Sequence, residues 1–284
     1  MSDIRKINSL VITDAVKRMF LESVHVIGKD IYISICDAKK NETSLIAKEI
    51  LDELIINYDI AKNERIPICQ DTGYAVVFVE IGQEVIVVNG NLTNAIEEGV
   101  RQAYEEGYLR KSIVSDPIFE RKNTNDNTPP IIHYTIVDGD SIEITVTAKG
   151  FGSENMSAIK MLSPSDGVGG VKTFVLETIR AAGPNPCPPI IVGIGIGGTM
   201  EKAAIMAKRA TIREINKHNE NVKYKELEEE LLTKINELGI GPAGLGGKTT
   251  ALAVNIEYYP THIAGLPVAI NICCHAARHA YIKL

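Results

Sequence analysis

The stretch from Pro189 to Ala203, PIIVGIGIGGTMEKA, carries the clearest structural pattern in this 284-residue chain. Its apolar opening predicts a buried strand over 189–194, and the run that begins at Thr199 predicts a helix over 199–219. Glycines separate the two patterns, as is typical of a tight strand-to-helix turn. The same alternation recurs along the second half of the chain. It predicts a mixed α/β body with glycine-rich strand–helix junctions.

The segments before this body show other patterns. Residues 1–64 carry apolar positions at helical spacing, with a second helical run over 41–63. β-Branched runs over 75–88 predict paired strands, and a helix follows over 92–109. The segments 131–137 and 141–148, joined by Asp138-Gly139-Asp140, predict a β-hairpin.

Further elements are predicted in the second half. We expect helices over 154–162, 171–182 and 224–238, and strands over 250–257 and 268–272. The fold class is therefore mixed α/β (α+β), with an N-terminal helical part, 1–64, followed by a mixed α/β body, 65–284. The two could also form one continuous domain, 1–284.

Composition excludes several classes of protein. Apolar residues make up 45% and charged residues 23%, which is normal for a folded, water-soluble protein. A net charge of −6, no tryptophan and an aromatic share of 5% argue against nucleic acid as a partner. The longest uncharged stretch, 181–200, contains four prolines and five glycines, which a lipid-exposed helix would not tolerate. Residues 1–12 lack an apolar run of signal-peptide length, so the sequence predicts a cytoplasmic protein.

Two glycine-rich motifs resemble nucleotide-binding loops without matching them. The run from Gly193 to Gly198 satisfies G-x-G-x-x-G, but the acidic residue expected about 20 positions later, Glu214, falls inside a predicted helix. A tight turn, or a helix N-terminus that faces another anion, explains this run as well. The run from Gly244 to Thr249 has Pro242 where a P-loop needs its first glycine, and a strand-like segment follows it.

Three cysteines follow or precede predicted strands. Cys69 lies in PICQDTG, Cys187 lies in the proline-rich run PNPCPP, and Cys274 belongs to CCHAAR. A single cysteine in such a place is usually a small buried apolar residue, but three in strand-end loops are harder to explain in that way. They lie too far apart in sequence for a compact zinc finger. They could hold an iron–sulfur cluster, and because a cubane cluster usually takes four cysteines, one iron would lack a protein ligand and could polarise a substrate oxygen.

Several long motifs, in order, give the chain a family resemblance. They are ICQDTG at 68–73, AKGFGSENMS at 148–157, GIGIGGTMEKA at 193–203, GIGPAGLGGKTTAL at 239–252 and the CHAAR run at 274–278. The chain resembles the α subunit of the class I, iron–sulfur-dependent fumarate hydratase and L-tartrate dehydratase family. The resemblance implies that Cys69, Cys187 and Cys274 bind a 4Fe-4S cluster. Cys274 is preferred to Cys273 because an Ala-x-Arg segment follows it.

The resemblance also implies a substrate site. A dicarboxylate needs cationic donors, and Arg110 offers a planar fork that matches a carboxylate, although it could simply be a solvated arginine at a helix end. Asp71 is expected to hold a hydroxyl group or move a proton, with a strand-capping role as the alternative. The other predicted contacts are Gln70 beside the cluster, backbone N–H groups at Gly150 and Gly152, and His262, which could also be an ordinary polar residue. His275 and His279 lack the glutamate of H-E-x-x-H, so we predict a structural role for both.

The predicted function is that of an α subunit in a two-subunit hydro-lyase that reversibly hydrates fumarate to malate. The alternatives are an L-tartrate dehydratase α subunit, which would convert tartrate to oxaloacetate, and a non-catalytic cluster-binding or regulatory relative. In this family a β subunit carries the rest of the active site. We therefore expect a β-subunit partner, a small dicarboxylate substrate and a dimer of αβ pairs, without nucleic acid or membrane partners.

Overall fold

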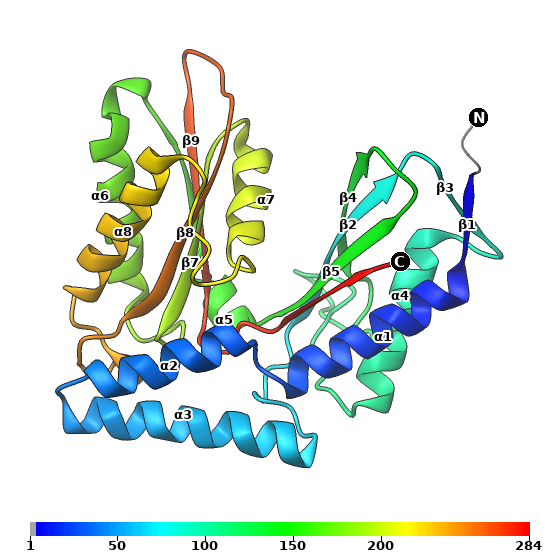
Figure 1. Ribbon diagram of the computed structural model, residues 1–284, viewed down its shortest axis with the longest axis horizontal. Coiled ribbons are helices and arrows are strands. Elements are labelled where there is room, and N and C mark those ends of the chain that lie inside the picture. Colours follow the sequence, from blue (N-terminus) through cyan, green and yellow to red (C-terminus); the bar gives the residue numbers. More distant parts are fainter. Residues whose placement is uncertain (1–3) are drawn as a thin grey trace. The chain divides into compact units, whose positions relative to one another are not determined.

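The computed structural model describes residues 4–284 and divides the chain into two compact units (Figure 1). Unit 1 contains the residues up to 28, residues 60–150 and residues 278–284, and unit 2 contains residues 29–59 and 151–277. The chain therefore passes from one unit to the other four times. The division into 1–64 and 65–284 stays a prediction, and residues 1–3 of its first part lie outside the described residues.

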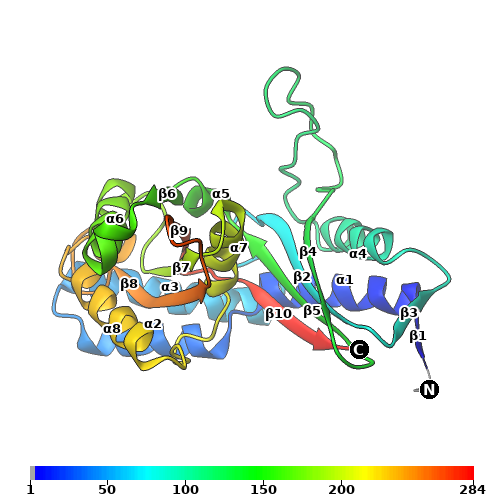
Figure 2. The same ribbon diagram turned by 90° about the horizontal axis from the view of Figure 1, so that it is seen from above.

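Unit 1 is built on a four-stranded sheet with the order β10-β5-β2-β4. A second, two-stranded sheet joins β1 to β3 in parallel, and two helices, α1 and α4, lie along the larger sheet (Figure 2). The elements are β1 (Arg5–Asn8), α1 (Ser9–His25), β2 (Tyr74–Gly82), β3 (Val85–Val88), α4 (Leu92–Glu106), β4 (Ile131–Val137), β5 (Ile142–Lys149) and β10 (His279–Lys283). Asn8 caps α1 by accepting a hydrogen bond from the N–H of Leu10 at 3.0 Å.

The strand pairing in unit 1 differs from two of the predictions. β4 and β5 do not form a hairpin, because β2 lies between them, parallel to β4 and antiparallel to β5. Likewise β2 and β3 do not pair with each other, since β3 pairs with β1. Alternation of apolar residues indicates which face of a strand is buried, but it does not identify the neighbouring strand. At the end of β2 the N–H of Gly82 bonds the Ser141 carbonyl, in the β4–β5 connection, at 2.9 Å.

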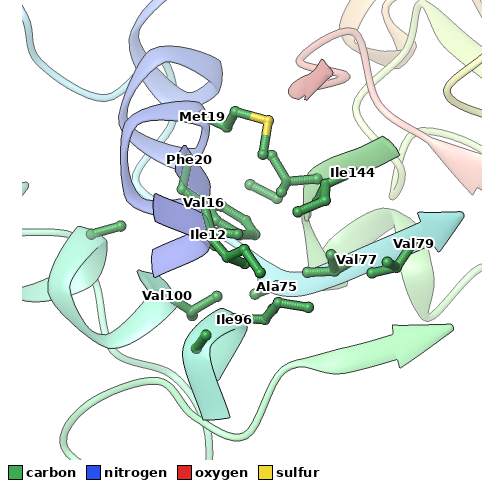
Figure 3. Packing of buried hydrophobic residues seen from close by; sticks show 14 of the residues in the cluster. Ile12, Val16, Met19, Phe20, Ala75, Val77, Val79, Ile96, Val100 and Ile144 are labelled. Atoms are coloured by element: carbon green, nitrogen blue, oxygen red, sulfur yellow. The ribbon is translucent and has the colours of Figure 1, made fainter. Parts of the chain in front are cut away.

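The core of unit 1 lies between the sheet and its two helices (Figure 3). Alternate residues of β5, among them Ile142, Ile144 and Val146, are fully buried against α1. The apolar face of α1 supplies Ile12 and Phe20, which are also fully buried. Burial of each such side chain contributes about 1.5–3 kcal/mol. This core supports the start of β2 and the loop before it.

Unit 2 has a second four-stranded sheet, with the order β6-β9-β7-β8. Helices α6 and α8 cover one face of it and α7 the other (Figure 1). The elements are α2 (Lys29–Asn41), α3 (Leu45–Glu64), α5 (Phe151–Glu154), β6 (Ala158–Leu162), η1 (Pro164–Asp166), α6 (Gly167–Ala182), β7 (Ile190–Gly197), α7 (Met200–Ala210), α8 (Val222–Asn236), η2 (Pro242–Gly244), β8 (Ala251–Tyr259) and β9 (Leu266–Cys273). The division between units falls within α3, after Asp59. The predicted mixed α/β class is confirmed.

Two predicted helices of unit 2 are wrong in type or length. Residues 158–162 form the edge strand β6, with Ala158 opposite Ile270 of β9, instead of continuing the helix that ends at Glu154. AIKML has good helix formers, and pairing with β9 overrides that local preference. The helix predicted over 199–219 ends at Ala210, and the segment after it is held by polar contacts described below.

The glycines of β7 are explained by close packing of α7. A Cβ atom at Gly193 would lie 2.1 Å from the carbonyl oxygen of Ala207, and one at Gly195 would lie 2.0 Å from that of Ala203. Any side chain at these positions would push α7 off the strand. Gly197 and Gly198 then turn the chain with φ values of +90° and +66°, a region in which glycine is unstrained. The G-x-G-x-x-G run is thus a tight strand-to-helix turn.

Candidate active site

The loop that carries Cys69, Gln70 and Asp71 leads into β2 and is held by α1 and α4. The N–H of Ile68 bonds the Val24 carbonyl of α1 at 2.9 Å. Tyr104 of α4 donates its hydroxyl to the carbonyl oxygens of Thr72 and Gly73, both at 2.8 Å. Burial raises the pKa of the Tyr104 phenol well above its usual value, so the group remains a neutral donor. Cys69 and Asp71 are partly exposed on this loop, and Gln70 is exposed.

Arg110 lies next to this loop in unit 1. The Thr72 hydroxyl donates to the backbone carbonyl of Arg110 at 3.0 Å, while the Arg110 side chain is exposed. The segment after Arg110 is held by buried Asn127, whose side-chain oxygen accepts the N–H of Ser112 at 2.7 Å. Gln70, Asp71 and Arg110 are therefore brought together within one unit.

Two buried cations lie on the segments around Asp71 and Gly150. Arg278 is only 1% exposed, and its Nη1 donates to the backbone carbonyl of Asp71 at 2.6 Å. A Cβ atom built on Gly150 would lie 3.4 Å from both Arg278 Nη2 and Asp71 Oδ2, so guanidinium and carboxylate both border this glycine. Lys149 is 2% exposed and donates from Nζ to the Gly150 carbonyl at 3.2 Å. Buried cations are costly, so their presence on these segments marks a site with a special electrostatic role.

Sequence reasoning missed Arg278 and Lys149 as site residues. Both lie inside motifs that carried the family resemblance, CHAAR and AKGFGS. Their burial depends on which strands pair, because Lys149 ends β5 and Arg278 directly precedes β10, which pairs antiparallel with β5. Arg278 Nε is buried and lacks a hydrogen-bond partner within residues 4–284, so the guanidinium retains donor capacity at this site.

The Cys187 loop in unit 2 has strained backbone geometry. Cys187 has φ +55°, a conformation that is costly for a residue with a side chain. The N–H of Ala243 bonds the Pro188 carbonyl at 2.8 Å, and Gly244 packs closely on Pro184, so η2 braces the loop. The Cys187 side chain is exposed. A loop that is held in place and carries an exposed thiol could supply a metal ligand.

The adjacent cysteines 273 and 274 have different surroundings. Cys273 is the last residue of β9, pairs opposite Ile191 and is buried. Cys274 follows the strand and is partly exposed. Next to it, the buried Tyr58 hydroxyl lies 2.8 Å from His275 Nδ1 and donates to the His275 carbonyl at 3.2 Å. Burial, with a contribution from Cys274, raises the pKa of Tyr58 well above its usual value.

The remaining predicted site residues also lie in unit 2. Gly152 belongs to the short helix α5, and a Cβ atom on it would lie 3.8 Å from the Asn185 carbonyl in the Cys187 loop. His262 lies on the exposed β8–β9 connection and borders an apolar cavity lined by Ile196, Tyr224 and Leu227. The His262 ring Nδ1 accepts the N–H of Ala264 at 3.2 Å.

The predicted cluster ligands are divided between the units, with Cys69 in unit 1 and Cys187 and Cys274 in unit 2. Within residues 4–284 no three His, Cys, Asp or Glu side chains lie close enough together to hold a metal ion. The donor chemistry itself fits an iron–sulfur cluster, because all five cysteines are thiols and these three lie on loops with accessible sulfur.

The P-loop-like run 244–249 contacts a carboxylate of the same chain, that of Glu42. Glu42 is 2% exposed, and its carboxylate accepts the N–H groups of Lys248 at 2.7 Å, Thr43 at 2.7 Å and Ser44 at 3.1 Å. Burial opposes ionisation of Glu42, but the backbone N–H groups outweigh it and lower the pKa of the carboxyl. Gly247 lets the carboxylate approach, since a Cβ there would lie 2.9 Å from Glu42 Oε2. The loop is therefore a cradle for Glu42.

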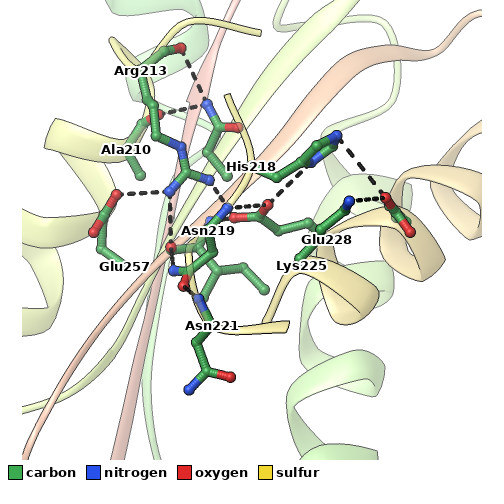
Figure 4. A network of polar contacts seen from close by, with 11 residues as sticks. Ala210, Arg213, His218, Asn219, Asn221, Lys225, Glu228 and Glu257 are labelled. Atoms are coloured by element: carbon green, nitrogen blue, oxygen red, sulfur yellow. Dashed lines mark hydrogen bonds and ion pairs between the residues drawn. The ribbon is translucent and has the colours of Figure 1, made fainter. Parts of the chain in front are cut away.

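A second polar cluster fixes the segment after α7 (Figure 4). Buried Glu228 pairs with Arg213 and accepts the N–H groups of Ile256 at 2.7 Å and Asn219 at 3.1 Å. Arg213 also pairs with Glu257 at 2.9 Å. These contacts tie residues 213–219 to β8 and α8. We assign this cluster a structural role, and it replaces the helix predicted there.

Comparison with known proteins places these features in a family. The family model "Fumarate hydratase (Fumerase)" matches residues 13–283. A Methanocaldococcus jannaschii protein named "Putative L(+)-tartrate dehydratase subunit alpha" is 46% identical over 280 residues, covering 96% of this chain and 97% of that protein. The L(+)-tartrate dehydratase subunit alpha of Escherichia coli is 34% identical over 257 residues, covering 90% of this chain and 84% of its own. The protein of that name from Shigella sonnei is 35% identical over 251 residues, covering 88% and 82%.

These matches confirm the resemblance drawn from the motifs and the hydro-lyase class that it implied. The relatives' names favour the tartrate alternative over the fumarate prediction. Among residues 4–284, no helix combines the length and the apolar character that crossing a membrane requires. The family match spans nearly the whole chain, both units included. The chain belongs to the fumarate hydratase (Fumerase) family.

Proposed function

We propose that this chain is the α subunit of an iron–sulfur hydro-lyase that removes water from L(+)-tartrate to give oxaloacetate. Support comes from the names of relatives that match over 96% and 90% of the chain. Fumarate hydration is the second candidate, because the matching family model is described as fumarate hydratase. Both substrates are small dicarboxylates, so the two candidates make the same demands on the charges of the site.

The observation that carries the proposal is the charge of the site in unit 1. Buried Arg278 contacts the Asp71 carbonyl and buried Lys149 contacts the Gly150 carbonyl, so two cations lie in the region that holds the Asp71 carboxylate. A dicarboxylate bound there would be favoured by this positive balance, because charges interact more strongly when water is excluded. Arg110, exposed beside the same loop, would bind one substrate carboxylate through its planar fork.

Each residue of the site has a proposed role. Asp71 would hold a substrate hydroxyl group or move its proton, and Gln70 would donate its amide to the substrate. Gly152 would offer a backbone N–H, and His262 would contact the substrate. Arg278 would act as a positioning residue, since its bond to the Asp71 carbonyl fixes the loop on which Gln70 and Asp71 lie.

We further propose that Cys69, Cys187 and Cys274 hold a 4Fe-4S cluster in which one iron lacks a protein ligand. When bound, such a cluster supplies a Lewis acid for the leaving hydroxyl group. The partly exposed Cys274, rather than buried Cys273, supports the choice within the adjacent pair. The strained, braced loop of Cys187 supports its role as a ligand.

The proposed partner is a β subunit that carries the remaining catalytic groups, in a cytoplasmic dimer of αβ pairs. Its support is the name "subunit alpha" of the relatives. Proximity and orientation contribute about 7–11 kcal/mol in well-ordered sites. The α chain without its β subunit should therefore react many powers of ten more slowly than the complete enzyme.

The experiment is anaerobic reconstitution of the full chain with iron and sulfide, alone and with its β chain. The two preparations are assayed side by side on tartrate isomers, malate and fumarate. We expect the chain alone to be inactive and the pair to dehydrate L(+)-tartrate faster than it hydrates fumarate. Preference for fumarate would select the second candidate, and activity of the chain alone would contradict the two-subunit proposal.

A further inference from the structure

Strand β4 forms an exposed edge of the unit 1 sheet. It is the last strand in the order β10-β5-β2-β4, and within the described residues β2 is the strand bonded to it. Ile136 is 73% exposed, and Ile131 and Tyr134 are also exposed. An edge strand presents a row of backbone N–H and C=O groups that can pair with another strand.

β4 lacks one common protection of such an edge, a charged side chain. Its sequence, IIHYTIV, contains no Asp, Glu, Lys or Arg. The other edge strands of the two four-stranded sheets each carry a charge, Lys283 in β10, Lys160 in β6 and Glu257 in β8. Proteins place charges on edge strands to prevent pairing with other chains. The absence of charged residues from β4 therefore indicates that this edge can pair with another strand.

The sequence of β4 is complementary to itself when it runs antiparallel. With Tyr134 at the centre, Ile132 comes opposite Ile136 and Ile131 comes opposite Val137. His133 and Thr135, which come opposite each other, are the polar positions among the β-branched and aromatic contacts. Pairs of this kind stabilise antiparallel strands.

The residues that flank the strand fit the same register. Pro130 precedes the strand, and Asp138 follows it. In the antiparallel register each Asp138 meets Pro130 of the second copy, so the two carboxylates lie at opposite ends and do not repel each other. Proline has no N–H to donate, so pairing would end there.

We propose that β4 pairs with β4 of a second copy of this chain, about a two-fold axis at Tyr134. The pairing would join two four-stranded sheets into one continuous eight-stranded sheet. A two-fold interface uses the same patch on both copies, which a self-complementary strand provides. This inference does not depend on the proposed reaction, because it concerns residues 131–137 only.

The first test measures the oligomeric state of the purified full chain by light scattering after gel filtration. We expect a dimer, and we expect Ile136→Lys to shift it to monomer by at least tenfold in Kd, because a charge then faces Ile132 of the other copy. Ile136 is mostly exposed, so the variant should keep the circular-dichroism spectrum of the folded chain. Ile263→Lys, at a residue of unit 2 that is 91% exposed, is the matched control and should stay dimeric.

The second test fixes the register by disulfide formation under mild oxidation. Residues directly opposite each other in an antiparallel pair have Cα atoms about 4.5–5.5 Å apart, within disulfide reach. Tyr134→Cys should therefore give a covalent dimer whose linked peptides both contain position 134. Ile131→Cys is the control, because its two copies would lie roughly 20 Å apart at about 3.4 Å per residue.

Three results would overturn the proposal. They are a monomeric full chain, a dimer that Ile136→Lys leaves intact, and linkage at position 131 in place of 134. If a strand of the β subunit pairs with this edge instead, the α chain alone should be monomeric, and Ile136→Lys should abolish its complex with the β chain. That result would also overturn pairing between copies.

Discussion

Arg278 joins the last strand of the chain to the loop that carries Asp71. Its guanidinium donates to the Asp71 carbonyl, and its own carbonyl accepts the N–H of Ala148 at 3.0 Å. Sequence reasoning could place Arg278 in a motif but could not show its burial, because burial follows from the pairing of β10 with β5. Substitution of Arg278 therefore tests the site at the scale of one residue.

Replacing Arg278 by Met removes the charged hydrogen-bond donor to the Asp71 carbonyl. We expect the free energy of unfolding in urea to fall by about 1.5–3 kcal/mol, as for other hydrogen bonds to charged groups. In the reconstituted αβ enzyme, kcat should fall more than KM rises, and Arg278→Lys should recover part of kcat. Arg180→Met, at an exposed arginine of α6, should change stability by less than about 0.5 kcal/mol. Equal stability of the two Met variants would contradict the role given to Arg278.

Glu42 gives a prediction for pH. Its pKa is lowered in the folded state, so its contribution to stability is fully present above the unfolded value of about 4.3 and is lost as the pH falls through the folded value. Glu42→Gln should cost roughly 1–3 kcal/mol at pH 7, measured by urea unfolding. The gap to the unmodified protein should shrink below pH ~4. Glu53→Gln, on the exposed side of α3, is the matched control; a gap that does not change with pH would count against the cradle.

At the scale of elements, the β7–α7 contact depends on glycine. Gly195→Ala would place a Cβ 2.0 Å from the Ala203 carbonyl and should destabilise the protein by about 3 kcal/mol or more, because helix and strand must separate. Gly169→Ala in α6 meets nothing within 4 Å and should be neutral or stabilising by up to ~1 kcal/mol. Thermal unfolding of the two variants tests the difference. Similar midpoints would show that α7 can move away from β7 at little cost.

Sequence patterns predicted the long elements well and their partners poorly. The helices predicted over 41–63, 92–109 and 171–182 match α3, α4 and α6 closely, because each has a continuous apolar stripe. The pairing of β2 between β4 and β5 was not predictable, since contacts between distant segments leave no local pattern. β6 was missed for the same reason, because its strand state comes from pairing with β9.

The site was predictable to the extent that its residues lie in motifs. Cys69, Gln70 and Asp71 share one motif, and the structure places Arg110 beside them through Thr72. Arg278 and Lys149 were not predictable as site residues, because their importance lies in burial. The surroundings of His262 also followed only from the structure, since they depend on the packing of α6 and α8 around the β8–β9 connection.

For the whole molecule, the central proposal is that Cys69, Cys187 and Cys274 bind one cluster. The family match spans both units, and the buried cations Arg278 and Lys149, on the Asp71 and Gly150 carbonyls, suit a dicarboxylate. The claim requires that Cys187, far in sequence from Cys69, take part in the same metal site.

The most direct measurement is the iron content of the full chain after anaerobic reconstitution, compared among single Cys→Ser variants. We expect about four irons per chain in the unmodified protein. The same content is expected in Cys36→Ser and Cys273→Ser, and little or none in Cys69→Ser, Cys187→Ser or Cys274→Ser, with matching loss of visible absorbance. Full iron content and an unchanged spectrum in Cys187→Ser would contradict the account.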